Sequence, residues 1–184
     1  MIVKSFEINK INNSHKIFLF YGENEGHKNE IIEDKFKKKY TNSIYGYEEN
    51  EILKKQENFF NEILSRSLFE KEKLIIINRT TDKIKNLIDE IIEKKIDDII
   101  IILNSNSLEK KSKLRILFEK NKDLTCIPFY ADNNQTLNSI INFFFREKKI
   151  SISQQLINVL IERSRGDRKN LRNELQKIES FSLN

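Results

Sequence analysis

The turn from Gly22 to Asn29 contains the residue types that come nearest to a chemical motif. It follows an apolar run, residues 16–21, and leads into a segment with a helical pattern. A strand that runs through a glycine-containing turn into a helix can cradle phosphates with its backbone amides. The pattern that does so is Gly, four residues, then Gly-Lys-Ser/Thr. The turn is therefore a candidate phosphate loop, in which Gly22, Gly26 and Lys28 correspond to the glycines and the lysine of the pattern.

The candidate loop departs from this pattern in its chemistry. Its second glycine comes one place early, so His27 stands where a bare backbone is needed. Asn29 replaces the hydroxyl that would ligate magnesium. Glu23 and Glu25 would repel a triphosphate, and the later strands lead into asparagine instead of the acidic pair that positions metal and water in an ATPase. We expect a degenerate loop that binds no nucleotide and needs no cofactor.

The rest of the chain offers no second catalytic set and no metal site. The single Cys126 cannot form an internal disulfide and lies in an apolar stretch, so we interpret it as a small buried hydrophobe. His15 and His27 lack companions at metal-ligand spacing. The net charge of +5, from 33 basic and 28 acidic residues, permits contact with nucleic acid without arguing for it.

Leu68 and Phe69 form an apolar pair between two predicted elements. The helical pattern before them places apolar residues on one stripe, which Leu68 could prolong by a turn, whereas Phe69 falls off the stripe. A charged quartet, residues 70–73, separates the pair from the next apolar run. The pair either fills the core at a helix end or is displayed for a partner's pocket. Periodicity alone leaves both interpretations open.

Apolar runs alternate with helical patterns over the first part of the chain. The runs read as strands at 16–21, 43–47, 74–77, 98–103 and 124–130, and helical patterns cover 25–40, 81–95 and 108–120 as well as the segment before Leu68. Strands that are apolar throughout are typical of a parallel sheet covered by helices on both faces. We predict an α/β domain over residues 1–133. Three helical patterns, at 137–149, 153–165 and 168–181, predict a small all-helical domain over 134–184.

The chain carries no feature that predicts a membrane protein. No run approaches the roughly 18 apolar residues of a membrane span, and the N-terminus lacks the apolar core of a secretory signal. We therefore expect a cytoplasmic protein. The sequence stops after an apolar helix without an obvious partner, so we expect further protein to follow in the natural gene.

Several short segments along the chain, taken together in their order and spacing, resemble those of one protein family. They are residues 18–24 (Phe-Leu-Phe-Tyr-Gly-Glu-Asn), 67–69 (Ser-Leu-Phe), 99–104 leading to 108–114, 150–153, 166–168 (Gly-Asp-Arg) and 170–178. The last two couple an Asp-Arg turn to an Asn-Glu-Leu-x-Lys helix at fixed distance. In this order and spacing the chain resembles the delta subunit of the bacterial DNA polymerase III clamp loader over essentially its whole length.

The resemblance implies an AAA+ fold: a P-loop-NTPase-like α/β domain, a helical lid and a collar domain, which is absent here. In that family the subunit hydrolyses no ATP, grips the sliding clamp and opens one interface of the ring. The family's clamp contact, a Leu-Phe pair at a helix end, carries over onto Leu68 and Phe69, with Ser67 matching the residue before them. Leu64 departs from the polar residue often found at the head of such motifs.

The resemblance also implies the partners. These are the sliding clamp, the other clamp-loader subunits, bound mainly through the missing C-terminal domain, and primer-template DNA in the assembly. The chain would have no catalytic activity of its own, although it would belong to the polymerase III holoenzyme, a DNA-directed DNA polymerase and nucleotidyltransferase. Two alternatives stay open: an ATP-binding AAA+ enzyme with a variant P-loop, and a stand-alone nucleic-acid-binding protein.

Overall fold

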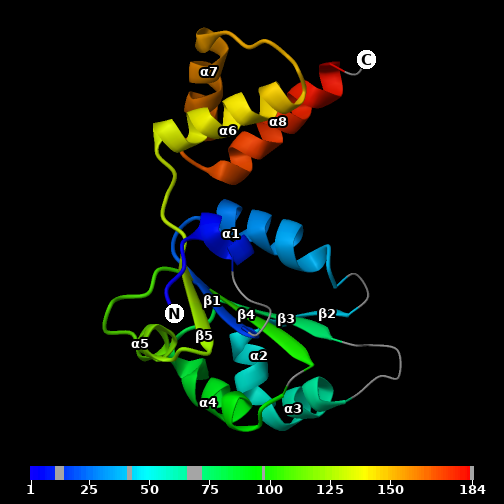
Figure 1. Cartoon of the computed structure of the whole chain (residues 1–184), viewed down its shortest axis with the longest axis vertical. Helices are drawn as coiled ribbons and strands as arrows, with labels where there is room; N and C mark the ends of the chain where they lie inside the picture. Colours follow the sequence, from blue (N-terminus) through cyan, green and yellow to red (C-terminus); the bar gives the residue numbers. More distant parts are fainter. Residues whose placement is uncertain (11–14, 41–42, 66–71, 97, 183–184) are drawn as a thin grey trace. The chain divides into compact units, whose positions relative to one another are not determined.

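The computed structural model describes residues 1–184 except 11–14, 41–42, 66–71, 97 and 183–184 (Figure 1). The chain divides into two compact units, an α/β unit of residues 1–23 and 30–129 and a helical unit of residues 24–29 and 130–184. The helical unit thus includes residues 24–29 and 130–133, which the sequence analysis assigns to the first domain.

A five-stranded parallel sheet forms the centre of the α/β unit. Its strands are β1 (Ile17–Tyr21), β2 (Ile44–Glu48), β3 (Lys73–Asn78), β4 (Ile99–Ser105) and β5 (Leu124–Pro128). They lie in the order β2-β3-β4-β1-β5, and every neighbouring pair is parallel. In the central strand Leu19 pairs with Leu103 of β4 and with Cys126 of β5. The predicted fold class is confirmed.

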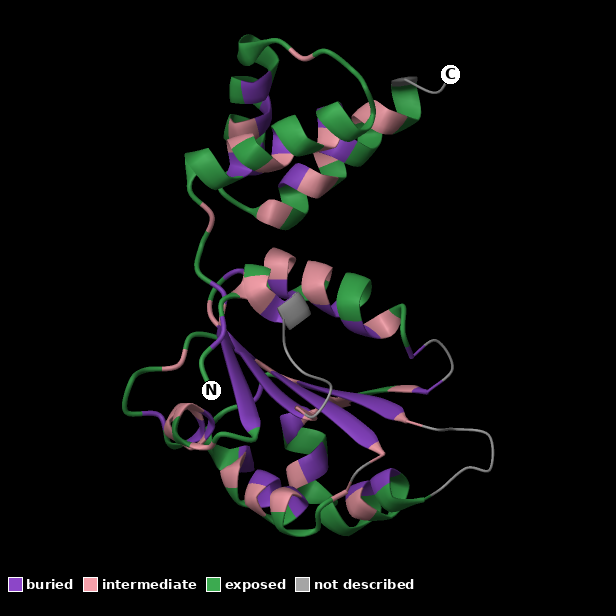
Figure 2. Ribbon diagram, viewed as in Figure 1, coloured by how far each residue is buried: buried purple, intermediate pink, exposed green. Residues whose placement is uncertain are grey.

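Helices cover both faces of this sheet (Figures 1 and 2). One face packs against η1 (Ser5–Lys10) and η2 (Ile32–Lys37), and the other against α2 (Glu49–Lys54), α3 (Gln56–Leu64), η3 (Asp82–Ile84), α4 (Lys85–Glu93) and α5 (Lys113–Lys120). Successive residues of β1 alternate between the two cores, as a strand requires. Each fully buried Leu, Ile or Phe contributes about 1.5–3 kcal/mol, so the sheet is stabilised from both sides.

The first predicted helix is divided in the structure. It begins as α1 (Glu25–Ile31) and continues as the π-helical turn η2. A π-helix is wider than an α-helix and appears mostly as a single turn. Here the turn presents Phe36 to the sheet, where its ring meets the edge of Phe18 with 5.2 Å between the centroids. Packing on the sheet therefore favours the wider turn over a continuous α-helix.

The helix predicted at 108–120 begins later, at Lys113, because two side chains cap it there. The Ser112 hydroxyl accepts a hydrogen bond from Arg115 N–H at 3.2 Å. Asp82 accepts from the Ser112 hydroxyl at 2.5 Å and from Leu114 N–H at 3.0 Å. Burial acts to raise the pKa of Asp82, but these hydrogen bonds outweigh it and hold the pKa below its usual value. Asp82 thus helps to cap the N-terminus of α5, and it is also the first residue of η3.

Three helices build the helical unit: α6 (Asn134–Glu147), α7 (Gln154–Ser164) and α8 (Arg168–Ser182). They enclose one apolar core, formed by Leu137, Ile141, Phe145, Ile157, Leu160, Leu171 and Leu175. Ser153 caps α7 by accepting a hydrogen bond from Leu156 N–H at 3.2 Å. Within the described part of the chain, none of the helices is both long enough and apolar enough to cross a membrane.

We expect Asp82→Ala to lower the free energy of unfolding by about 1–2 kcal/mol, because α5 loses both an acceptor for its first N–H groups and a negative charge near its N-terminus. Urea denaturation monitored by circular dichroism measures this change. Asp123→Ala is the matched control, since Asp123 is an exposed acid of the same unit, and its effect should stay within about 0.5 kcal/mol. Equal stability of the two variants would contradict the capping role.

Candidate functional site

The carboxyl ends of the strands form the edge where ligands bind in open α/β sheets. In this chain amide and hydroxyl groups lie there and bond to one another. The Asn104 side-chain amide donates to the Asn78 carbonyl oxygen at 3.3 Å, and the hydroxyls of Thr80 and Ser105 are 2.5 Å apart. The Asn104 side-chain oxygen is buried and has no hydrogen-bond partner within the described part of the chain. Neutral amides and hydroxyls lack the carboxylate charge that usually helps to hold the magnesium ion of a nucleotide site.

Gly22 is required by the turn after β1 for a packing reason. Its φ is +127°, and a Cβ there would lie 2.1 Å from the Phe129 carbonyl oxygen. The Gly22 N–H donates to the Asn106 carbonyl at 3.3 Å, so this amide already has a partner within the chain. The next residue, Glu23, accepts a hydrogen bond from the Ser107 hydroxyl at 3.4 Å. Gly22, the glycine that matches the motif, therefore allows the backbone of this turn to lie close to the backbone of Phe129.

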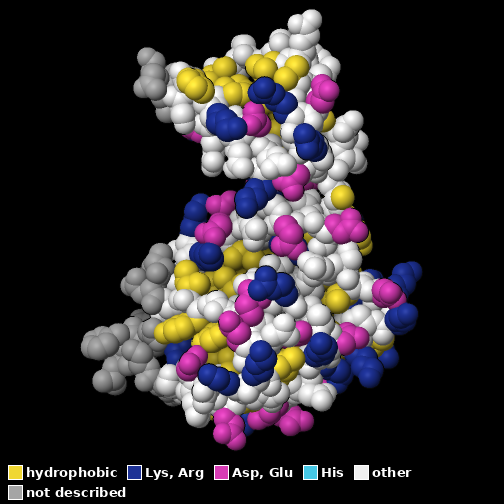
Figure 3. All heavy atoms as spheres, turned by 180° about the vertical axis from the view of Figure 1, so that it is seen from behind, with side chains coloured by type: hydrophobic (Ala, Val, Ile, Leu, Met, Phe, Trp, Pro, Cys, Tyr) yellow, Lys and Arg dark blue, Asp and Glu magenta, His cyan; other side chains and the backbone are white. Residues whose placement is uncertain are grey.

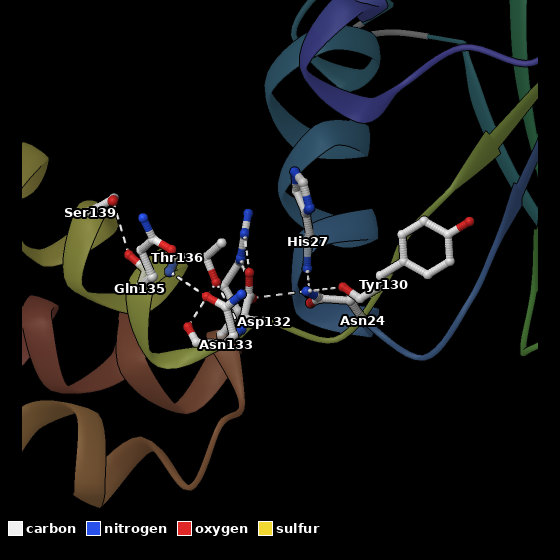
Figure 4. Close-up of polar contacts among 9 residues, drawn as sticks. Asn24, His27, Tyr130, Asp132, Asn133, Gln135, Thr136 and Ser139 are labelled. Atoms are coloured by element: carbon white, nitrogen blue, oxygen red, sulfur yellow. Dashed lines mark hydrogen bonds and ion pairs between the residues drawn. The ribbon is translucent and has the colours of Figure 1, made fainter.

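The other half of the candidate loop belongs to the helical unit, where Asn24 organises it (Figure 4). The Asn24 side-chain oxygen accepts from His27 N–H at 3.0 Å, which caps the first turn of α1. Its amide group donates to the Tyr130 carbonyl at 3.0 Å and to Asp132 at 2.8 Å. One side chain thus ties the start of α1 to the segment before α6.

Lys28 is fully buried, and its ammonium group forms an ion pair with the Glu25 carboxylate. In a functional phosphate loop the lysine reaches the phosphates of the nucleotide. Here a carboxylate from the same helix already neutralises that charge. Gly26 leaves no space either, because a Cβ there would lie 2.8 Å from the Lys169 backbone nitrogen in the first turn of α8. The expectation that this loop binds no nucleotide stays a prediction, and these contacts support it.

Arg168 and Asp132 form a two-point ion pair within the helical unit. The Arg168 Nε–H donates to one Asp132 oxygen at 2.7 Å and the Nη2–H to the other at 2.5 Å. The two side chains are only 11% and 4% exposed. Burial acts to raise the pKa of Asp132, but hydrogen bonds from Arg168 and Asn24 outweigh it and leave the pKa below its usual value. Arg168 is therefore committed to this pair, whereas Arg165 and Lys169 are exposed.

The expected contact residues Ser67, Leu68 and Phe69 lie outside the described residues. The structure describes the two flanks of residues 66–71, and both flanks are held by side chains. These two anchors are the features closest to the expected contact.

The first anchor is Lys73, the first residue of β3, which is only 7% exposed. Its ammonium group donates to the Glu62 carbonyl at 3.1 Å, to the Ser65 carbonyl and to the Ser65 hydroxyl at 3.4 Å. Helix α3 ends at Leu64, so these acceptors belong to its C-terminus. A cation placed there satisfies carbonyls that have no partner within the helix and complements the helix dipole.

The second anchor is Glu72, which precedes β3. It accepts a hydrogen bond from the Lys16 ammonium at 2.6 Å and from the Tyr40 hydroxyl at 3.2 Å. The hydrogen bond from Lys16 lowers the pKa of Glu72 below its usual value against the opposing effect of burial. Both anchors lie on the C-terminal side of residues 66–71. Lys73 is bonded to the end of α3, and Glu72 to Lys16 and Tyr40, which precede β1 and β2.

Sequence reasoning missed both the Lys73 anchor and the Asp132–Arg168 pair. Lys73 reads as part of a solvated charged quartet, and the only available signal is its position directly before an apolar strand. Asp132 and Arg168 are 36 residues apart, and no local pattern links them. Among the described residues no cluster of three or more His, Cys, Asp or Glu side chains could hold a metal ion.

Comparison with solved structures shows the fold. The chain is similar to the Bacillus subtilis clamp loader delta protein YqeN, with a TM-score of 0.61 and 14% identity over 96% of this chain and 56% of that protein. It is also similar to a Thermotoga maritima RuvB variant, with a TM-score of 0.55 and 15% identity over 90% of this chain and 54% of that one. No family model matches the sequence, and no curated protein matches it.

These likenesses show an AAA+-like α/β fold, and in this chain a helical unit follows it. The chain spans about half the length of the two proteins. At this level of identity the likeness concerns the fold alone.

We expect Asp132→Asn to lower the free energy of unfolding by about 3 kcal/mol at neutral pH, because it leaves the buried Arg168 charge without a carboxylate. The folded-state pKa of Asp132 is depressed, so its contribution is present above the unfolded-state pKa and is lost as the pH falls through the folded-state value. The difference in stability between the two proteins should therefore begin to shrink as the pH falls below about 4 and should keep shrinking towards the folded-state pKa.

Thermal melts of both proteins between pH 3 and 7 measure this difference. Glu162→Gln, a change at an exposed acid of α7, is the control and should leave the wild-type pH profile unchanged. A gap between wild type and Asp132→Asn that does not vary with pH would contradict the role of the charge.

We expect the chain to show no micromolar, magnesium-dependent binding of a fluorescent ATP analogue, since Lys28 is already paired with Glu25. Fluorescence anisotropy with and without magnesium tests this. Saturable binding that Lys28→Met removes would contradict the prediction and favour the ATP-binding alternative.

Proposed function

We propose that this chain is the clamp-binding part of a clamp-loader delta subunit, which binds the DNA polymerase sliding clamp and opens its ring during DNA replication. The observation that carries the proposal is the structural likeness to the B. subtilis clamp loader delta protein over 96% of this chain. The order of short sequence segments, from the degenerate loop to the Gly-Asp-Arg turn, points to the same family independently of the structure.

We place the clamp contact at Leu68 and Phe69, with Ser67 before them. An apolar pair that fills a desolvated pocket on a partner can supply much of the energy of an interface. The segment that contains the pair follows α3 and precedes β3, between the anchored residues Ser65 and Glu72.

The subunit would hydrolyse no ATP itself. The chemistry of its loop supports this part of the proposal: Glu25 neutralises Lys28, and the Gly22 N–H is bonded to the chain's own backbone. In the assembly, other subunits would supply ATP hydrolysis.

Ring opening would follow from differential binding. A ligand shifts an equilibrium only by the difference between its affinities for the two states. We propose that the pair fits the clamp better when one interface of the ring is open. A tenfold higher affinity for the open ring would shift the free energy of the opening equilibrium by about 1.4 kcal/mol towards the open state. The chain would thus act as a mechanical part of the loader with no chemical step of its own.

The assembly implied by this function is a cytoplasmic, hetero-oligomeric clamp loader within the DNA polymerase III holoenzyme, working on primer-template DNA. Figure 3 shows Lys and Arg side chains interleaved with Asp and Glu over the face that it displays. This face therefore gives no support to an independent nucleic-acid-binding role, for which a continuous basic track is typical.

We expect the double variant Leu68→Ala, Phe69→Ala to lose capture by the immobilised sliding clamp of the same genome. The reason is that the apolar anchor of the interface is removed, and truncation of such an anchor typically costs 2 kcal/mol or more, about thirtyfold in affinity. A pull-down measures capture, while the circular dichroism spectrum and melting temperature should stay close to those of the wild type.

Leu53→Ala is a control for loss of apolar volume, since Leu53 is a partly buried residue of α2 and should affect stability more than capture. A large fall in melting temperature in the Leu68, Phe69 variant would support a core role for the pair. Undiminished capture by a folded double variant would contradict the proposed contact.

A further inference from the structure

We propose that a groove between α4 and α5 is a docking site for an acidic amphipathic helix of a partner protein. The groove belongs to the α/β unit, where the two helices pack together on one face of the sheet (Figure 1). The proposal goes beyond the proposed function and does not depend on it. The volume of the groove is about 440 Å³, and it is lined by Lys85, Lys113, Ile116, Leu117, Lys120 and Asn121.

The groove has an apolar centre on the outward side of α5. Leu114 and Phe118, on the inward side of the helix, are fully buried in the core beneath it. Ile116 and Leu117 are only partly buried, and Ile116 is not among the residues that pack against this core. Aliphatic surface left partly in water is stabilised when a partner covers it. The centre of the groove therefore favours an apolar side chain of a partner.

Lysines lie at both ends of this apolar centre. Lys113 and Lys120 are exposed and seven positions apart, so they share one face of α5 with about 10 Å between them along the helix axis. Ile116 and Leu117 lie between them on the same face. Within the part of the chain that the structure describes, neither ammonium group has an ion-pair partner. The two charges thus remain available to acidic groups from outside.

The acidic side chains near the groove are already bonded to other groups. Asp82 accepts hydrogen bonds from the first backbone N–H groups of α5 and from the Ser112 hydroxyl. Glu119 pairs with Arg115 at 2.7 Å, on another side of the same helix. Asp89 pairs with Lys85 at 2.5 Å, so the α4 wall of the groove is locally neutral. The positive charge of the groove therefore comes from the α5 side.

Charge complementarity identifies the occupant. A helix that binds in a groove uses anchor residues at positions i, i+3, i+4 and i+7. On α5 these positions are lysine, isoleucine, leucine and lysine. The matching partner helix carries acid, apolar, apolar and acid at the same spacing. A nucleic acid would supply negative charge but no apolar side chain to cover Ile116 and Leu117, and its usual site is a continuous basic track.

The main test measures fluorescence anisotropy of a labelled helical peptide of about 15 residues with Glu-Ala-Ala-Leu-Leu-Ala-Ala-Glu at its centre. The wild-type chain should bind it saturably with a dissociation constant of about 50 µM or less. Lys113→Glu combined with Lys120→Glu should weaken binding more than about tenfold, because two attractive pairs become repulsive. The matched control is Lys54→Glu with Lys55→Glu, the same charge change at exposed lysines outside the groove, and it should leave affinity within about twofold.

Two further measurements separate specific docking from general charge attraction. A peptide with lysine in place of both glutamates should bind the charge-reversed variant and not the wild type. A peptide with alanine in place of both leucines should bind the wild-type chain about tenfold more weakly, and Ile116→Ala should weaken binding of the original peptide to a similar extent. The peptide changes need no altered protein, so they test the groove even if a variant of the chain does not fold.

Four results would overturn the inference. They are no saturable binding at about 500 µM protein, equal affinity for the leucine and alanine peptides, binding of an oligothymidylate of about 20 nucleotides that only the lysine changes remove, and a dimer in sedimentation that the charge-reversed variant loses. The third would assign the groove to nucleic acid, and the fourth to a second copy of the chain. No clamp is present in these assays, so their outcome is separate from that of the proposed function.

Discussion

Burial of the sheet on both faces is the constraint on which the rest of the structure depends. Four of the five strands are apolar almost throughout, and helices cover each side of them. A surface of this kind leaves no place for a polar site except at the strand ends and in the connections. At the carboxyl ends Asn104 donates to Asn78 and the hydroxyls of Thr80 and Ser105 bond to each other, and the partner contact at Leu68 and Phe69 stays a proposal.

The residues of the candidate phosphate loop are held by contacts within the chain. In an ATPase the lysine of the loop binds the phosphates of the nucleotide. Here Lys28 forms an ion pair with Glu25, and Gly26 packs against the first turn of α8. The Asn24, Asp132 and Arg168 contacts make the start of α1 part of the helical unit. These contacts join the start of α1 to the segments before α6 and at the start of α8 by hydrogen bonds of the chain itself.

The parallel sheet and the three-helix unit could be predicted from the sequence because their signals are local: continuous apolar runs for strands, and apolar spacing with Ser153 as a cap for helices. Cys126 is fully buried as expected, and burial raises the pKa of its thiol to about 12. The start of α5, the Lys73 anchor and the Asp132–Arg168 pair could not be predicted in this way. Each depends on a partner that only the tertiary structure brings close, as Asp82 does for Leu114 across 32 positions.

Calorimetric titration of the wild-type chain into the sliding clamp of the same genome tests the central claim most directly. The account predicts saturable binding with a dissociation constant at or below about 10 µM, equivalent to roughly −7 kcal/mol. It also predicts that a clamp whose ring interface has been weakened by mutation binds more tightly than the closed ring, since the preference for the sprung interface is the source of opening. No binding at clamp concentrations of about 100 µM, or equal affinity for the closed and weakened rings, would contradict it.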